Sequence, residues 1–333
     1  MSKPLVVVES PAKAKTLSKF LGSDYDVRAS VGHVSDLPSK GLNIDVDNGF
    51  KPTYELTERG KTVIKDLKAA LKDASELYLA TDEDREGEAI SWHLLEYLKP
   101  KVPVKRMVFH EITKSAIDHA VSNPRGLDYG LVDAAETRRI LDRLYGYEVS
   151  PVLWRRVNRG LSAGRVQSPS VRLIVERERE RIAYVTADYW DIDLGTATQP
   201  AFAAKLVAVA GARVATGKDF DERGQVSDKA VALDEARARG LADGLADATF
   251  TVRSVEEKPY RSSPKPPFMT STLQQEGGRK LRLSSSQVMR VAQGLYERGF
   301  ITYMRTDNVV LSDEAMQATR AAVTNEYGAN YLN

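Results

Sequence analysis

The chain twice repeats the order of a short apolar strand, a polar turn and a helix. Residues 4–8 form an apolar run typical of a buried strand, and Glu9 follows it directly. Ser10 then suits a helix N-cap, Pro11 suits the first helical position, and Gly22 is expected to end the helix. This first repeat therefore predicts a strand that delivers an acidic side chain to the start of a helix.

The second repeat predicts a strand at residues 77–80 and a helix from about Glu86 to Leu98. Alternation of strands and helices predicts an α/β fold in which helices cover a mostly parallel sheet. Ligands of such sheets bind at the carboxyl ends of the strands. We therefore expect Glu9 and the acidic residues after the second strand to lie at one edge of the sheet.

The turn between the second strand and its helix carries clustered carboxylates, among them Asp82, Asp84 and Glu86. Asp82 and Asp84 are two residues apart, so an extended backbone can point both to one side. Clustered hard oxygens suit Mg²⁺, and Glu9 can join them. The sequence thus predicts a magnesium site that neutralises phosphate charge.

Clustered acids at this position have two other interpretations. Acidic side chains near a helix N-terminus are favoured by the helix dipole and need no metal. A calcium-binding EF-hand is excluded, because His93 stands where that loop requires its bidentate Glu.

The rest of the chain changes character twice. Residues 126–183 are helical and Arg-rich, and residues 184–262 alternate in a way typical of strands, apart from a helical insertion at 228–247. Prolines between 259 and 267 indicate a domain boundary. The expected strands within this β-rich segment are 189–194, 203–209 and 250–255.

Residues 263–333 are expected to form helices and one strand. A helix near 286–298 is ended by Gly299, and residues 300–304 are strand-like. Two adjacent glycines, Gly277 and Gly278, stand in an expected helix, where they would cost about 2 kcal/mol together. The expected buried face of the 286–298 helix consists of Val288, Val291, Ala292, Leu295 and Tyr296.

Composition excludes several classes of protein. The 333 residues include no Cys, which excludes disulfides and thiolate metal sites, and no apolar run is long enough to span a membrane. We expect a cytoplasmic protein. Residues 138–181 hold 11 Arg against five acids, and 261–305 hold eight Lys or Arg against two Glu. Such basic blocks predict a polyanionic partner, although solvated helix faces would look the same.

Five segments together resemble the type IA DNA topoisomerases, whose metal-binding part is the toprim domain. They occur in the order that the family shows and extend over essentially the whole chain. The segments are VVESPAKAKT at 7–16, SVGHVSDLP at 30–38, ATDEDREGEAI at 80–90, LSAGRVQS at 161–168 and GFITYMRTD at 299–307.

The resemblance implies an enzyme that cleaves one DNA strand, passes DNA through the break and reseals it without ATP, relaxing negative supercoils. Tyr303 would attack a DNA phosphate to form a 5′-phosphotyrosine, and Arg305 would offer a cation to that phosphate. Glu9 and Lys13 match positions near the leaving 3′ oxygen. Glu9, Asp82, Asp84 and Glu86 would bind Mg²⁺.

A single-stranded DNA channel is also implied, because arginines pair with phosphates and aromatic rings stack on bases. Its expected contacts are His33, Arg138, Arg139, Asp142, Arg143, Tyr147, Trp154, Ser162, Ala163, Gly164, Arg165, Val166 and Gln167.

The resemblance implies a toprim domain (1–125), a helical DNA-channel segment (126–183), the outgoing arm of a β-rich arch (184–262) and a partial helical tyrosine domain (263–333). Because the returning arm is not in this sequence, we expect a fragment that does not relax DNA alone. We expect a monomer that acts at the nucleoid on single-stranded or negatively supercoiled DNA. The alternatives are another toprim enzyme (topoisomerase III-like, primase or nuclease) or a non-catalytic nucleic-acid-binding piece.

Overall fold

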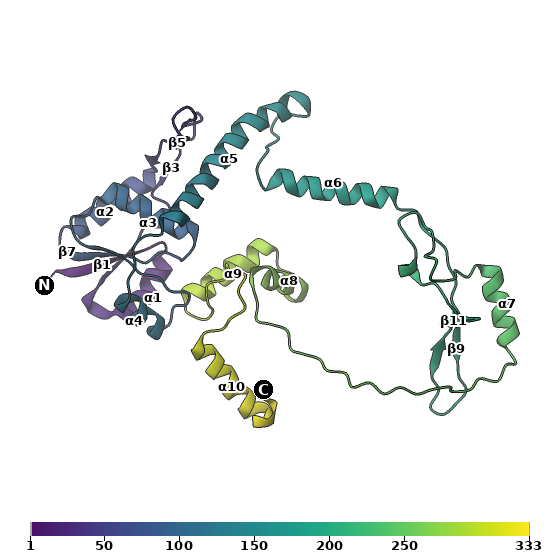
Figure 1. Cartoon of the computed structure of the whole chain (residues 1–333). Helices are drawn as coiled ribbons and strands as arrows, with labels where there is room; N and C mark the ends of the chain where they lie inside the picture. Colours follow the sequence, from purple (N-terminus) through teal and green to yellow (C-terminus); the bar gives the residue numbers. More distant parts are fainter. Residues whose placement is uncertain (1, 333) are drawn as a thin grey trace. The chain divides into compact units, whose positions relative to one another are not determined.

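The computed structural model describes residues 2–332 and divides the chain into two units. Residues 1–162 and 263–333 form the first unit, and residues 163–262 form the second (Figure 1). Each unit is described separately below. None of the helices in the described chain has the length and apolar character needed to cross a membrane.

A four-stranded parallel sheet forms the centre of the first unit. Its order is β2 (Asp26–Ala29), β1 (Lys3–Val8), β7 (Ala74–Leu79) and β8 (Val104–Arg106). This confirms the parallel α/β fold predicted from the sequence. Because the sheet is covered on both faces, the C-terminal halves of the two central strands, residues 5–8 and 77–79, are continuously apolar rather than alternating.

Helices cover the two faces of the sheet in pairs. The helices α2 (Glu58–Leu71) and α3 (Arg85–Leu98) lie on one side, and α1 (Pro11–Leu21) and α4 (Lys114–Ser122) lie on the other (Figure 1). Successive side chains of β1 point to opposite faces of the sheet. Val7 packs with α2 and α3, and Val8 packs with α1 and α4.

The caps predicted for α1 are present. The Ser10 hydroxyl accepts the Lys13 amide at 3.1 Å, Pro11 is the first helical residue, and Gly22 ends the helix at φ +71°. The α3 helix is likewise capped by Asp84, whose side chain accepts the Gly87 amide at 2.8 Å. Local sequence signals therefore determine where both helices begin. The same signals determine where the two acid-bearing turns end, because each turn leads directly into one of these helices.

Two short antiparallel strand pairs lie within the loop between β2 and α2. One pairs β3 (Ser35–Asp36) with β6 (Glu55–Leu56), and the other pairs β4 (Ile44–Asp45) with β5 (Lys51–Pro52). After α4 comes the 28-residue helix α5 (Tyr129–Arg156).

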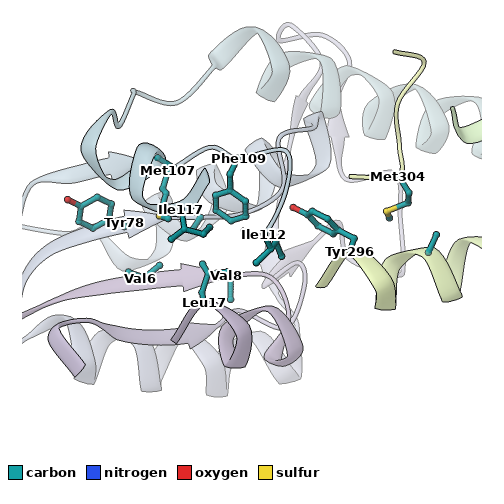
Figure 2. Close-up of a cluster of buried hydrophobic side chains, with 13 residues drawn as sticks. Val6, Val8, Leu17, Tyr78, Met107, Phe109, Ile112, Ile117, Tyr296 and Met304 are labelled. Atoms are coloured by element: carbon teal, nitrogen blue, oxygen red, sulfur yellow. The ribbon is translucent and has the colours of Figure 1, made fainter. Parts of the chain in front are cut away.

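The end of the chain returns to the sheet. The helices α8 (Thr270–Leu281), α9 (Ser285–Glu297) and α10 (Asp313–Tyr327) belong to the first unit. Tyr296 of α9 and Met304 beyond it join the same buried cluster as Val6 and Val8 of β1 (Figure 2). The segment that carries Tyr303 is therefore held on the sheet by a shared apolar core.

Three expectations for this region are corrected. Residues 300–304 form no strand, because the Tyr303 amide bonds singly to the His110 carbonyl at 2.7 Å instead of joining a ladder. Val291 is 52% exposed, on the solvent side of α9. Gly277 is required by packing, since a Cβ there would lie 2.6 Å from Val288 of α9.

The second unit contains α6 (Gln167–Ala183), the strand pairs β9 (Asp193–Gly195) with β10 (Ala203–Lys205) and β11 (Ala208–Val209) with β12 (Ala212–Arg213), and α7 (Glu235–Leu245). Val214, Leu233 and Ala238 form its small core. The strand predicted at 250–255 is absent from the described chain. Its apolar side chains are exposed, so the alternation has neither a partner strand nor a covered face.

Candidate active site

The acidic residues lie at the carboxyl edge of the sheet, as predicted. Glu9 follows β1, and residues 80–84 link the adjacent β7 to α3. The Ala80 amide donates to the Val7 carbonyl at 2.8 Å, which extends the pairing of these two strands up to the turn. The parallel register thus brings two acid-bearing turns side by side.

Lys13 joins the acids of these two turns. Its side chain is fully buried, and its Nζ lies 3.0 Å from Glu9 Oε1 and 2.8 Å from Asp82 Oδ1. Burial raises the pKa of Glu9 to about 7, with Lys13 acting in the opposite direction. Burial also acts to raise the pKa of Asp82, but Lys13 and the hydrogen bonds to this carboxylate leave it lowered.

Tyr303 and Arg305 converge on a different acid. The Tyr303 hydroxyl donates to Asp84 Oδ2 at 2.6 Å, and Arg305 Nη1 lies 3.2 Å from the same oxygen and 2.6 Å from Glu86 Oε2. Burial and the bond to Asp84 raise the pKa of Tyr303. The structure therefore brings together Tyr303 and Arg305, the two residues that the sequence assigned to one DNA phosphate. The strand expected to carry Tyr303 is not formed.

The four candidate metal ligands form two pairs, each around a protein cation. In residues 2–332 no three acidic or His side chains are grouped as a metal site. The oxygens of Asp84 and Glu86 nevertheless fit a metal, because one nitrogen of Arg305 already touches both. The guanidinium stands in for a cation that carboxylate oxygens would bind.

A buried arginine, Arg106, supports the acidic turn and was not predicted from the sequence. The Arg106 guanidinium is fully buried and donates to Glu88 at 2.9 Å and to the carbonyls of Thr81 at 2.8 Å and Asp82 at 2.9 Å. These bonds fix the backbone path between β7 and α3. The only sign of this role in the sequence is that Arg106 is a charged residue beside an apolar stretch, at the end of a strand.

A groove leads from the acids along α5. A cavity of about 260 Å³ is lined by Glu86, His33, Arg138, Arg139 and Asp142, among others. The adjoining hollow is also lined by Arg139 and Asp142. It continues along α5 past the three remaining residues of this helix that were predicted to contact DNA. These are Arg143, Tyr147 and Trp154.

Some groove residues already have protein partners. Arg139 pairs with Asp36, and Arg143 donates to the Leu37 and Gly41 carbonyls at 3.3 Å. Trp154 Nε1 donates to the Leu161 carbonyl at 2.6 Å. Burial lowers the pKa of His33, so the imidazole tends to be neutral.

The predicted contacts at 162–167 straddle the boundary between the units. Ser162 ends the first stretch of the first unit, and Ala163, Gly164, Arg165, Val166 and Gln167 open the second unit. The Gly164 carbonyl accepts the Ser168 amide at 2.9 Å, at the start of α6. Their contact with DNA stays a prediction.

Two protein families match this chain. The toprim domain family matches residues 4–112, and the DNA topoisomerase family matches residues 126–333. DNA topoisomerase 1 of Streptomyces coelicolor is 58% identical over 98% of this chain and 37% of its own length. DNA topoisomerase 1 of Mycolicibacterium smegmatis is 55% identical over 99% of this chain and 38% of its own length.

A solved structure shows the same likeness. Full-length topoisomerase I from Thermotoga maritima matches with a TM-score of 0.79 and 37% identity, over 99% of this chain and 54% of that one. The present chain thus spans well under half the length of the two bacterial relatives above. By sequence and by fold, the chain belongs to the type IA DNA topoisomerase family.

Proposed function

We propose that this chain carries the strand-cleaving site of a type IA DNA topoisomerase that relaxes negatively supercoiled DNA. The observation that carries the proposal is the contact of the Tyr303 hydroxyl with Asp84, beside Arg305 and at the end of an Arg-lined groove. A primase or nuclease built on the same acids needs no tyrosine at this carboxylate.

The contacts assign a task to each residue. Tyr303 Oη attacks the phosphorus, and its proton passes to Asp84, the carboxylate that already accepts it at 2.6 Å. The bond from phosphorus to the 3′ oxygen breaks as the phosphotyrosine bond forms, and Lys13 donates a proton to the departing oxygen. Arg305 offsets the charge on the phosphoryl oxygens.

Resealing is the reverse reaction. The 3′ hydroxyl attacks the phosphotyrosine, which conserves the energy of the broken bond, so no ATP is consumed. Asp84 and Glu86 are the residues that would hold a divalent metal, with Mg²⁺ the ion suited to their oxygens. When bound, such an ion supplies positive charge near the phosphate.

The groove along α5 is proposed to hold single-stranded DNA. Arg138, Arg139 and Arg143 would pair with phosphates, and Tyr147 and Trp154 would stack on bases. We further propose that the protein acts as a monomer at the nucleoid in the cytoplasm.

Covalent trapping tests the proposal. The chain is incubated with a single-stranded oligonucleotide labelled at its 3′ end, the end that stays on the fragment joined to Tyr303, and after denaturation the labelled protein is measured. We expect an adduct that Tyr303→Phe abolishes and that Tyr327→Phe, an exposed tyrosine of α10, leaves unchanged. An adduct that persists in Tyr303→Phe would refute the assignment.

A further inference from the structure

A second tyrosine, Tyr296 of α9, is buried beside the proposed nucleophile. Its side chain has no exposed surface, and its hydroxyl donates to Asp82 Oδ1 at 3.0 Å. Figure 2 shows its ring reaching from α9 with the hydroxyl directed toward the sheet. From the sequence, Tyr296 is expected only on the buried face of the 286–298 helix.

Tyr296 lies beside three groups of the site, and the proposed reaction gives a task to two of them, Lys13 and Tyr303. The Asp82 oxygen that it bonds also accepts Lys13 Nζ at 2.8 Å. Its ring lies 5.7 Å from the Lys13 ammonium and meets the Tyr303 ring edge-on, at 5.2 Å and 61°. One side chain thus borders both the group that attacks and the group that protonates the leaving oxygen.

Packing alone explains the ring of Tyr296 but not its hydroxyl. A phenylalanine would fill the same apolar space, whereas a buried hydroxyl costs free energy unless it is bonded. Here the partner is a carboxylate, and hydrogen bonds to charged groups are stronger than neutral ones. The hydroxyl also gives Asp82 Oδ1 a second donor, which leaves that carboxylate little freedom to turn away from Lys13.

We propose that Tyr296 is a positioning residue of the cleavage site, and this inference rests on the proposed function. Its hydroxyl holds Asp82 on Lys13, so that the ammonium stays where the 3′ oxygen departs. Its ring supports one side of Tyr303. Small displacements of reacting groups cost large factors in rate, so a loss of this support is measurable.

The test compares two Tyr→Phe variants of the full chain in the covalent-trapping assay. We expect Tyr296→Phe to slow adduct formation by at least about tenfold, because it removes a buried bond to a charged group. Tyr78→Phe is the matched control, since Tyr78 is 4% exposed and its hydroxyl lies 3.4 Å from Lys105, away from Asp82. Thermal melting confirms that both variants are folded.

A double variant separates positioning from general packing. If Tyr296 acts through Asp82, Tyr296→Phe has little further effect on adduct formation in an Asp82→Ala chain. Adduct formation that is unchanged in Tyr296→Phe, equally slowed in Tyr78→Phe, or slowed in full again on top of Asp82→Ala would overturn the inference. Absence of any Tyr303-dependent adduct from the unsubstituted chain would instead refute the proposed function.

Discussion

Replacing Gly299 by Ala tests how Tyr303 is held against the acids. Gly299 ends α9 at φ +80°, and a Cβ there would lie 2.5 Å from the Ile112 carbonyl oxygen. A left-handed conformation costs a residue with a side chain roughly 1–2 kcal/mol. Overpacking against backbone adds roughly 1–3 kcal/mol. The sum, about 2–5 kcal/mol, is a large part of the 5–15 kcal/mol that stabilises a typical domain.

Hydrogen exchange with thermal melting measures the effect. The Tyr303 amide donates to the His110 carbonyl, so we expect Gly299→Ala to expose this amide to exchange more than the amides of β1 and β7. Gly294→Ala is the control, because nothing lies within 4 Å of a Cβ in the middle of α9. It should be neutral or stabilising by about 0.5–1 kcal/mol. Unchanged stability and unchanged Tyr303 protection in Gly299→Ala would refute the reasoning.

Three further predictions concern charge. Arg305→Ala should tighten Mg²⁺ binding in calorimetry, because the guanidinium no longer occupies the two carboxylates it bridges; weaker binding would contradict this. Burial lowers the pKa of His93 to about 4, so only the unfolded chain takes up this proton between about pH 6.5 and 4. His93 should therefore contribute a loss of up to about 3 kcal/mol as the pH drops through that range, opposed by Glu9, whose raised pKa of about 7 stabilises the folded chain over nearly the same range. The His93 contribution is measured in urea melts as the difference between the pH profiles of the unsubstituted chain and His93→Gln, and identical profiles would contradict it. Single-strand binding should weaken with salt, and replacing Arg138 and Arg139 by Ala should reduce the log–log slope by about 1.4; an unchanged slope would remove both from the DNA path.

Elements with local signals were predicted correctly from the sequence. The start of α1 depends on Ser10 and Pro11, and its end on Gly22, and each of these residues lies at the helix end that it determines. The parallel sheet followed from the order of strands and helices alone. By contrast, the strand predicted from apolar alternation at 250–255 was wrong, because a strand requires a partner strand that the local sequence does not reveal.

Features that depend on tertiary contacts could not be predicted from the sequence. Gly277 looked like a defect of α8 in the sequence, yet it permits the close approach of Val288 in α9. The acids were predicted as one metal cluster, because nothing near them in the chain showed which cations they would meet. Glu86 and its partner Arg305 are 219 residues apart.

The two pairs of acids differ in how readily a metal can enter. Lys13 is fully buried between Glu9 and Asp82, and breaking a buried ion pair by removing one partner costs roughly 3–5 kcal/mol. Arg305 is 49% exposed, and exposed pairs contribute roughly 0–1 kcal/mol. Arg305 would therefore give up its carboxylates to a divalent ion more easily than Lys13 would. A metal bound at this edge of the sheet would thus be held by Asp84 and Glu86, while Glu9 and Asp82 would keep their lysine, and Arg305 would be free to face the phosphate beside Tyr303.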